Sequence, residues 1–320
     1  MLQLDANEVA ARLGRVPLID ALERAFRSEI HSPARQHYTV GSSAHGDDFL
    51  LTMPAWQPGR CIGIKLVTVF PGNSRQGHPA VNAVYALFSG RNGSPIATLD
   101  GTELTRRRTA AASALAARFL ARPEASRLLM VGTGALAPHV IDTYTTARPI
   151  SAVRVWGRTS QRAQAVSGSF AGRSIEIEAI DDLEAGVRWA DIISCATLAT
   201  APLVQGAWLR PGQHLDLIGS FTPEMREVDD EALARSRIYV DTREGALAES
   251  GELVQAMAGG LVTAADICGD LAALTRGTVS GRRSAEEITL FKSVGCAIED
   301  LAAAELALGS AGGLTCNSAT

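Results

Sequence analysis

Short apolar runs alternate with amphipathic segments over the second part of the chain, from about Arg127 to Val240. Segments such as SQRAQAVSGSF and DDLEAGVRWA separate the runs and have the apolar spacing of surface helices. This alternation predicts a parallel sheet with helices on both faces, that is, a doubly wound α/β domain. The predicted strands are Leu128–Val131, Val153–Trp156, Ile175–Ile180, Ile192–Cys195, His214–Ile218 and Ile238–Val240.

The first hundred residues have a different pattern, in which strand-like runs such as CIGIKLVTVF and VNAVYALFS are joined by short turns. Short turns favour a separate, largely antiparallel sheet. A long helix is predicted from Asp100, with Glu103 in a capping-box-like position, to the break at Pro123. The segment AEEITLFKSVGCAIEDLAAAELAL is predicted to be helical and to return to this first domain, and the tail GSAGGLTCNSAT is predicted to be mobile.

Composition and charge narrow the class of protein. With 46 % hydrophobic and 20 % charged residues, the chain resembles a soluble protein with a sizeable core. A net charge of -4 gives no reason to expect nucleic acid or an anionic membrane as a partner. Five cysteines without a C-x-x-C pair, and six histidines without an H-x-x-x-H pattern, predict neither a disulfide framework nor a metal site. No signal peptide or apolar run of about 18 residues is evident, so a cytoplasmic location is expected.

The stretch RLLMVGTGALAPHV carries a candidate nucleotide site. Gly132, Gly134 and Ala137 fit the pattern G-x-G-x-x-G/A directly after a predicted strand and at the start of a predicted helix. Glycines there let the backbone approach a pyrophosphate, which the amides of the helix N-terminus stabilise. The alternative is a tight strand–helix turn that binds no ligand.

The end of the second strand, VRVWGRTS, bears on the choice of dinucleotide. NAD sites usually carry a carboxylate about 20 residues after the glycines, which binds the ribose hydroxyls. Here Gly157 occupies the end of the strand, and Arg158 and Thr159 follow it. An arginine and a hydroxyl can bind a 2′-phosphate, so NADP is favoured and NAD stays possible. The alternative is that Arg158 is a solvated loop residue.

Two cations lie at positions where apolar residues are expected. Arg108 falls on the apolar stripe of the helix DGTELTRRRTAAASALAARFL, and Lys65 has apolar neighbours on both sides in CIGIKLVTVF. A buried unpaired cation costs several kcal/mol. Few buried carboxylates are evident in this region, so we expect a substrate to supply the anion. An internal salt bridge, or an exposed position near the start of the helix, is the alternative.

Six segments resemble the ornithine cyclodeaminase / mu-crystallin family in order and over nearly the whole chain: GIKLVTVFPGN, LTRRRTAAASALAARFLARP, VGTGALA, VWGRTSQRA, LIGSFTPEMREVD and LFKSVGCAIEDLAA. The resemblance implies a homodimer of two-domain subunits that hold an amino or imino acid beside a nicotinamide. We therefore expect a mixed α/β domain for substrate binding and dimerisation (residues 1–120 with 290–320). A Rossmann-type dinucleotide-binding domain is expected at residues 121–289.

The resemblance also assigns site residues. Lys65 and Arg108 match cations that bind the substrate carboxylate and are the expected catalytic residues, and Arg35 in SPARQH matches a third cation. Gly219 and Ser220 follow a predicted sheet strand, and the segment KSVG matches one near the nicotinamide ring. The expected cofactor-binding residues are Gly132, Thr133, Gly134, Ala135, Leu136, Ala137, Gly157, Arg158, Thr159, Ala196, Thr197, Gly219, Ser220, Ser293, Val294 and Gly295.

Two departures from the family pattern bear on the substrate. Ornithine cyclodeaminases carry carboxylates for the substrate's amino groups where this chain has Leu51 and Phe221, which we expect to line the substrate site. Without them, a second buried ammonium group would cost on the order of 3–5 kcal/mol, so ornithine is disfavoured.

The hypothesis is therefore an oxidoreductase of amino-acid metabolism that reduces a small cyclic imino acid of the Δ1-pyrroline-2-carboxylate type. Lys65 or an ordered water would donate the proton, because a lysine among cations and apolar groups has a lowered pKa. The alternatives are cyclodeamination of ornithine to proline and ammonia with recycled NAD, and non-catalytic, NADPH-dependent ligand binding.

Overall fold

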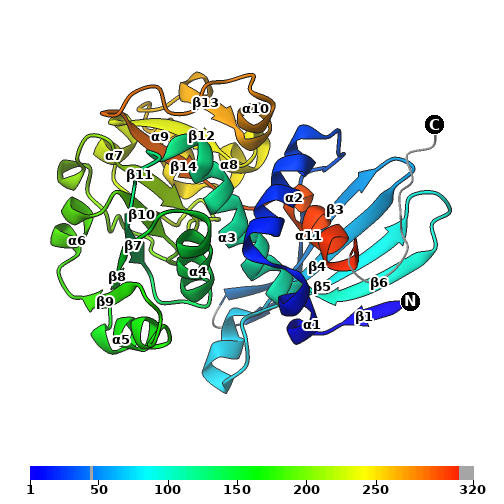
Figure 1. Ribbon diagram of the computed structural model, residues 1–320. Helices are drawn as coiled ribbons and strands as arrows, with labels where there is room; N and C mark the ends of the chain where they lie inside the picture. Colours follow the sequence, from blue (N-terminus) through cyan, green and yellow to red (C-terminus); the bar gives the residue numbers. More distant parts are fainter. Residues whose placement is uncertain (44–45, 310–320) are drawn as a thin grey trace. The chain divides into compact units, whose positions relative to one another are not determined.

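The computed structural model describes residues 1–43 and 46–309, so Cys316 and nearly all of the predicted mobile tail lie outside the described residues. The chain divides into two compact units (Figure 1). Unit 1 comprises Met1–Arg108 and Cys296–Thr320, and unit 2 comprises Thr109–Gly295. None of the helices in the described residues is both long and apolar enough to cross a membrane.

Unit 1 is built on a six-stranded sheet. Its strands are β1 (Leu2–Leu4), β2 (Gln36–Ser43), β3 (Gly46–Gln57), β4 (Cys61–Val69), β5 (Val81–Ser89) and β6 (Pro95–Asp100), in the order β1-β6-β5-β4-β3-β2. Neighbouring strands from β2 to β6 are antiparallel, as the short turns predicted, and β1 is parallel to β6.

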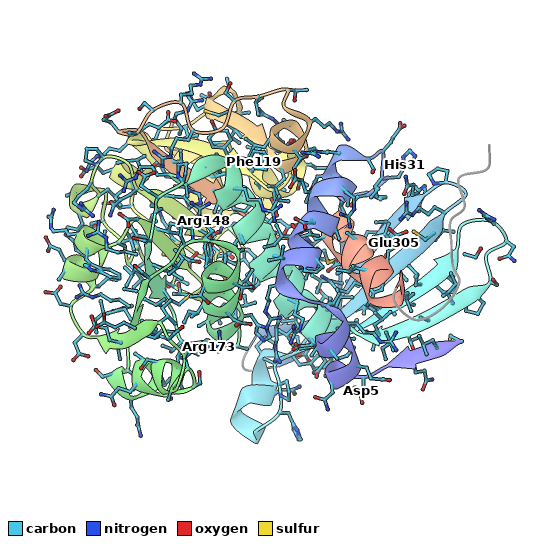
Figure 2. The ribbon with its side chains drawn as sticks, viewed as in Figure 1. Asp5, His31, Phe119, Arg148, Arg173 and Glu305 are labelled. Atoms are coloured by element: carbon cyan, nitrogen blue, oxygen red, sulfur yellow. The ribbon has the colours of Figure 1, made fainter. Side chains whose placement is uncertain are left out.

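One face of this sheet is buried. Along β4 the burial alternates, with Cys61 and Lys65 buried and Ile62 and Leu66 exposed. Helix α11 (Ala297–Gly309) packs against β3, β4 and α2 (Arg15–Arg27). Glu305 of α11 accepts a bond from Arg60 Nε at 2.7 Å (Figure 2), which fastens the helix beside the start of β4.

The other elements of unit 1 are local. Helix α1 (Ala6–Arg12) begins after Asp5 (Figure 2), which forms a capping box with Glu8. The 3₁₀ helix η1 (Pro71–Gln76) connects β4 to β5, and α3 (Gly101–Leu120) contains the boundary between the units. The side chain of Asp100 caps α3 by accepting from Glu103 N at 2.7 Å, as the sequence predicted.

Unit 2 is a doubly wound α/β domain with an eight-stranded, entirely parallel sheet (Figure 1). Its strands are β7 (Arg127–Val131), β8 (Ala152–Trp156), β9 (Glu176–Ile180), β10 (Ile192–Cys195), β11 (His214–Leu217), β12 (Ser236–Val240), β13 (Ile267–Asp270) and β14 (Ile288–Lys292). Its helices are α4 (Ala137–Ala147), α5 (Ser160–Gly168), α6 (Leu183–Trp189), α7 (Asp230–Ala234), α8 (Arg243–Glu249), α9 (Gly251–Ala258) and α10 (Leu271–Arg276), with 3₁₀ turns η2 (Gly206–Trp208) and η3 (Ala264–Asp266).

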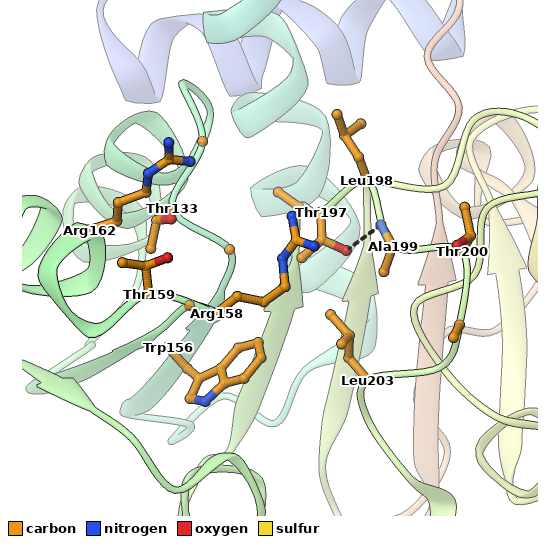
Figure 3. A pocket seen from close by; sticks show the side chains of 15 residues that line it. Thr133, Trp156, Arg158, Thr159, Arg162, Thr197, Leu198, Ala199, Thr200 and Leu203 are labelled. Carbon is orange, nitrogen blue, oxygen red and sulfur yellow. Dashed lines mark hydrogen bonds between the residues drawn. The ribbon is translucent and has the colours of Figure 1, made fainter.

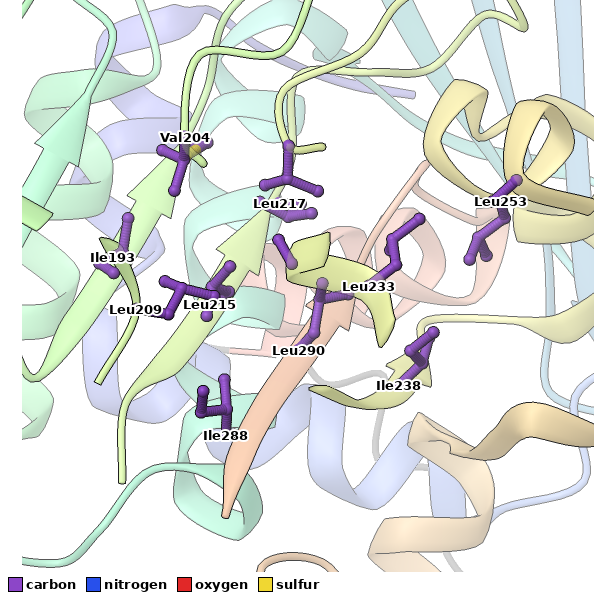
Figure 4. Close-up of a cluster of buried hydrophobic side chains, with 14 of the residues drawn as sticks. Ile193, Val204, Leu209, Leu215, Leu217, Leu233, Ile238, Leu253, Ile288 and Leu290 are labelled. Carbon is purple, nitrogen blue, oxygen red and sulfur yellow. The ribbon is translucent and has the colours of Figure 1, made fainter. Parts of the chain in front are cut away.

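The sheet separates two apolar cores. Leu129 and Val131 of β7 point into the core that also holds Leu215 and Leu290 (Figure 4), whereas Leu128 and Met130 point into the other. The order β13-β12-β14-β11-β10-β7-β8-β9 places β8 on one side of β7 and β10 on the other. The chain order reverses at that point, where parallel α/β sheets form a ligand crevice at the carboxyl ends of their strands.

The prediction for the last part of unit 2 was wrong. Residues 288–292 were predicted to be helical, but they form β14, which lies between β11 and β12. All five residues of β14 are buried, so no alternation marks them as a strand. The short strand β13 was also missed.

The units divide at Arg108/Thr109 and Gly295/Cys296, whereas the sequence pattern placed the boundaries at 120/121 and 289/290. The second part of α3 accounts for the first difference, because Ala110, Ala117 and Ala121 pack into a core of unit 2. The strand β14 accounts for the second.

Candidate active site

The turn between β7 and α4 has the geometry of a phosphate cradle. Gly132 has a φ of +121°, and a Cβ there would lie 2.5 Å from the carbonyl oxygen of Ala196, so only glycine fits. A Cβ at Gly134 would meet no atom within 4 Å, which leaves open space over the backbone. At the start of α4, Ala137 N donates to the carbonyl oxygen of Gly134 at 3.1 Å and Pro138 has no amide hydrogen, so the amides that can meet an anion here are those of the turn before the helix. These features fit the pyrophosphate of a dinucleotide.

A cavity of about 690 Å³ opens beside this turn (Figure 3). Three segments line it: the glycine turn, the end of β8 with the start of α5, and the loop after β10. The lining residues are Gly132, Thr133, Gly134, Trp156, Gly157, Arg158, Thr159, Arg162, Ala196, Thr197, Leu198, Ala199, Thr200, Ala201 and Leu203. Eight of the expected cofactor-binding residues are among them.

The part of the cavity after β8 is cationic. Arg158 and Arg162 both line it with Thr159, and no acidic residue is among the lining residues of the described chain (Figure 3). A Cβ at Gly157 would lie 2.6 Å from Thr133 Cγ2, so a larger residue at the end of β8 would collide with the turn. Sequence analysis missed Arg162. This residue follows Arg158 by four positions at the start of a helix, a spacing that places two side chains on the same side and could have indicated its role.

The remaining expected cofactor-binding residues do not line this cavity. Ala135 and Leu136 precede α4, and Ala137 is its first residue. Gly219 and Ser220 follow β11 and are buried.

The segment Ser293, Val294 and Gly295 follows β14. Asp241 Oδ2 accepts from Ser293 Oγ at 3.1 Å, from Val294 N at 2.8 Å and from Gly295 N at 2.6 Å, which fixes this segment at the carboxyl edge of the sheet. Sequence analysis did not single out Asp241.

Unit 1 contains a second cluster of functional groups, around Lys65 of β4. Lys65 Nζ lies 2.8 Å from Asp300 Oδ2, and Arg108 Nε donates to Asp300 Oδ1 at 2.9 Å. Arg108 Nη1 donates to Glu299 Oε2 at 2.6 Å. Lys65 is 2 % exposed and Arg108 5 %, and the two carboxylates are fully buried.

The environment shifts the pKa values of these groups in different directions. Burial lowers the pKa of Lys65 to about 8, with Arg108 and Arg35 adding to this effect and Asp300 opposing it. Burial alone would lower the pKa of Arg108, but Asp300 and Glu299 raise it above its ordinary value. Burial would raise the pKa of Asp300, but Lys65 and Arg108 hold it below its usual range. Lys65 is thus the member of the cluster that can release a proton near neutral pH.

The expectation that only a ligand neutralises these cations was wrong. Asp300 of α11 pairs with both cations and Glu299 pairs with Arg108, so the internal salt bridge is the arrangement observed. The signal was available, because an adjacent Glu–Asp pair in the apolar helix AIEDLAAAELAL is as misplaced as Arg108 in α3. The two acids lie far from both cations in the sequence, so only the fold shows that they are partners.

The other expected substrate residues have different surroundings. Arg35 precedes β2, is half-buried, and lies close enough to Lys65 for its charge to lower the pKa of that amine. Leu51 pairs with Val67 in the register, next to the pair of Met53 with Lys65 on the same face of the sheet. Phe221 belongs to unit 2 and is 41 % exposed.

Lysine is rare in this chain. Only Lys65 and Lys292 occur among 30 basic residues, and both are buried in ionic clusters. Lys292 Nζ lies 3.4 Å from Glu252 Oε2. A buried lysine can give up its proton, whereas arginine stays charged, so the use of lysine at these two positions has chemical meaning.

The chain has a Rossmann-type domain with a pocket for a dinucleotide and a mixed sheet that carries a buried Lys–Arg–Asp cluster. These features define the class of the protein, a two-domain dinucleotide-binding protein. The chain belongs to the Ornithine cyclodeaminase/mu-crystallin family, whose model matches residues 2–312.

Named relatives support this placement. The chain is 40 % identical to a Delta(1)-pyrroline-2-carboxylate reductase of Paracoccus denitrificans, over 88 % of this chain and 92 % of the relative. It is 37 % identical to the ketimine reductase mu-crystallin of Rattus norvegicus, over 95 % of each. The structure of the Thermococcus litoralis Delta(1)-pyrroline-2-carboxylate reductase in complex with NADH and L-proline has a TM-score of 0.91 and 32 % identity, and the match covers 97 % of both chains.

Proposed function

We propose that this protein is an NAD(P)H-dependent reductase of a small cyclic imino acid of the Δ1-pyrroline-2-carboxylate type. The observation that carries the proposal is the buried Lys65 with a pKa of about 8, held by Asp300 beside Arg108. The reductase names of the relatives and the NADH-bound neighbour support the same reaction.

The residues of unit 1 bind the substrate and supply the proton. Arg108 uses Nε and Nη1 for its acidic partners, so the substrate carboxylate takes its third nitrogen, Nη2, with Arg35 as the second cation. The ammonium of Lys65 donates its proton to the imine nitrogen, and Asp300 fixes the position of that ammonium. The proton makes the imine carbon more electrophilic.

Unit 2 binds the dinucleotide. The backbone amides of the glycine turn would hold the pyrophosphate, and the loop after β10 forms the facing wall of the cavity. The bound reduced nicotinamide supplies the hydride.

We propose NADPH as the preferred cofactor, because Arg158, Arg162 and Thr159 line the cavity without an acid. The experiment is Arg158→Ala, with the KM of both cofactors measured. The ratio of the KM for NADPH to that for NADH should rise about tenfold, as for the loss of one charge-assisted bond. An unchanged ratio would leave this preference without support.

We also propose a homodimer formed through the open face of the unit 1 sheet. Tyr38, Ile62, Leu66 and Val84 point to the face opposite Lys65 and are between 40 % and 51 % exposed. A row of exposed apolar side chains on one sheet face is typical of a protein interface.

Cyclodeamination of ornithine is the second candidate, and Leu51 argues against it. By the strand register, Leu51 lies on the same face of the sheet as Lys65. Its apolar side chain offers no hydrogen-bond or ionic partner to a second ammonium group of the substrate. Non-catalytic binding of a carboxylate ligand is the third, and the lowered pKa of Lys65 favours catalysis over it.

A single assay separates the three. NADPH and NADH oxidation is measured with five- and six-membered cyclic imino acids, with ornithine plus catalytic NAD as the control. We expect cofactor oxidation with an imino acid and no ammonia from ornithine. Ammonia release would select cyclodeamination, and binding of an imino acid without any oxidation of cofactor would select a ligand-binding protein.

A further inference from the structure

Seven of the lining residues of the dinucleotide cavity belong to the loop from Ala196 to Leu203, and one residue holds this loop at both ends. Glu227 Oε1 accepts from Thr197 N at 2.7 Å and from Thr197 Oγ1 at 2.9 Å. The carbonyl oxygen of Glu227 accepts from Leu203 N at 2.9 Å and from Val204 N at 3.0 Å. The neighbouring Arg226 N donates to the carbonyl oxygen of Ala199 at 2.7 Å, in the middle of the loop.

The same carboxylate also reaches the next strand end. Glu227 Oε2 accepts from Gly219 N at 2.8 Å, directly after β11. A Cβ at Gly219 would lie 2.0 Å from the carbonyl oxygen of Thr197, so the two strand ends are in close contact and Glu227 joins them. Its two oxygens therefore fix the loops that follow β10 and β11, at the edge where this sheet type binds ligands.

A buried ionic cluster lies behind these bonds. Glu227, Glu252 and Lys292 are all fully buried, which places two carboxylates and one amine in the core. Glu252 Oε1 accepts from Glu227 N at 2.8 Å, and its Oε2 lies 3.4 Å from Lys292 Nζ. Cys195 of β10 lies close enough for these charges to act on the pKa of its thiol, whereas Asp216 of β11 bonds Ser194 and Tyr144 instead and is affected only by the charge of Lys292. Buried charges of this kind are costly, so a cluster that only filled the core would be better replaced by apolar residues.

From this geometry we infer that Glu227 is a positioning residue for dinucleotide binding, which acts through Thr197 and Gly219 and requires its ionised form. The inference rests on the proposed use of a dinucleotide. An ionised carboxylate accepts all three bonds from Thr197 and Gly219, whereas protonation turns one oxygen into a hydroxyl, a weaker acceptor, and so weakens the bonds at one of the two strand ends.

The buried cluster brings the titration of Glu227 close to neutral pH, where its effect on cofactor binding can be measured. Burial raises the pKa of Glu227 to about 7, with Glu252 adding to the shift and Lys292 opposing it. Cofactor affinity should therefore decrease as the pH falls below about 7, because Glu227 takes up a proton. Removal of the charge of Glu252 should lower the pKa of Glu227 and move this midpoint to lower pH.

The first test measures the Kd of NADPH at pH 8 by the fluorescence of the reduced nicotinamide. In Glu227→Gln an NH2 donor replaces one of the two acceptor oxygens and so meets the amide of either Thr197 or Gly219. The Kd should therefore rise by about 10- to 100-fold, with kcat at saturating cofactor close to wild type. Asp216→Asn is the matched control: Asp216 is equally buried in the same sheet, but it accepts from Ser194 and Tyr144, which do not line the cavity. Its Kd should stay within about twofold of wild type, because the change costs stability only.

The second test is a pH series with NADH, which lacks the 2′-phosphate that titrates near pH 6. Wild type should lose affinity below pH about 7. Glu227→Gln should show no such loss, and Glu252→Gln should show it at lower pH. Glu252→Gln keeps the test valid if Glu227→Gln does not fold, since an unmoved midpoint would overturn the inference.

The outcomes separate this inference from the proposed function. If wild type binds neither NADPH nor NADH, the proposed function fails. If wild type binds the cofactor and Glu227→Gln binds it as tightly as wild type does, only the role of Glu227 is overturned. The same holds if Asp216→Asn loses as much cofactor affinity as Glu227→Gln.

Discussion

At the scale of single residues, the proposed chemistry depends on which cation of the Lys65 cluster can release a proton. Arg108 cannot, because Asp300 and Glu299 raise its pKa further above its ordinary value. Lys65 can, because burial and two neighbouring arginines lower its pKa to about 8. Asp300 has two roles for Lys65: it fixes the amine in place, and its charge keeps the pKa from falling further.

The first prediction concerns the pH dependence that Lys65 imposes. If its ammonium donates the proton, kcat/KM should decline above pH about 8, where Lys65 becomes neutral. Lys65→Met should lower kcat by about 10²- to 10⁴-fold and leave the Kd of NADPH unchanged. Steady-state rates between pH 6 and 10 and a fluorescence titration are the measurements. A wild-type rate that stays constant through this range would contradict the role of Lys65.

The second prediction uses Asp300→Asn, which removes the charge that opposes the loss of the proton from Lys65. The pKa of Lys65 should fall below about 8, and the decline in kcat/KM should move to lower pH. Because the chain has only two lysines, ¹⁵N labelling of lysine gives two side-chain signals, and that of Lys292 is the internal control. A Lys65 signal that titrates as in wild type would show that Asp300 does not set this pKa.

At the scale of elements, the sequence predicted the turn from β7 to α4 well and the far ends of the chain less well. Gly132, Gly134 and Ala137 mark a local motif, because the strand, the turn and the helix that it needs are adjacent in sequence. The strand β14 carries no such local mark, since its burial on both faces removes the alternation that identifies a strand.

The ionic clusters of both units were also predicted only in part, because their members are distant in sequence. Lys65 and Arg108 were recognisable as misplaced cations, but their partners Glu299 and Asp300 come from the last helix of the described chain. Glu227 was missed for the same reason, because only the fold places it beside Thr197 and Gly219. Pattern analysis finds an unusual residue; the partner that explains it depends on contacts distant in sequence.

The third prediction separates two glycines of the turn. Gly132→Ala should destabilise the fold by about 1–3 kcal/mol, because φ is +121° and the new Cβ would lie 2.5 Å from a carbonyl oxygen. Gly134→Ala should leave the free energy of unfolding nearly unchanged, because its Cβ meets no atom within 4 Å, but it should weaken NADPH binding by filling the cradle. Urea denaturation and cofactor titration of both variants are the measurements. Equal effects of the two substitutions on stability would contradict this account.

At the scale of the whole molecule, the sheet of unit 1 has two faces with different surroundings. The face that carries Lys65 is covered by α11, and the opposite face exposes Tyr38, Ile62, Leu66 and Val84. Alternation along each strand lets one sheet serve both purposes, because neighbouring residues point to opposite sides. The Lys65 cluster and the proposed dimer contact are therefore fixed by the same strands.

The fourth prediction tests this use of the open face. Val84→Asp puts a charge at the most exposed of these four positions, at 51 %. In a symmetric dimer the charge enters the interface twice, and each buried unpaired carboxylate costs several kcal/mol. We expect wild type to be a dimer and the variant a monomer by light scattering, with an unchanged Kd for NADPH because the cavity belongs to unit 2. Leu261→Asp is the control: this leucine of unit 2 is 42 % exposed and lies outside the face, so the variant should remain dimeric. A wild-type monomer, or dimers of Val84→Asp as stable as those of wild type, would place the contact elsewhere.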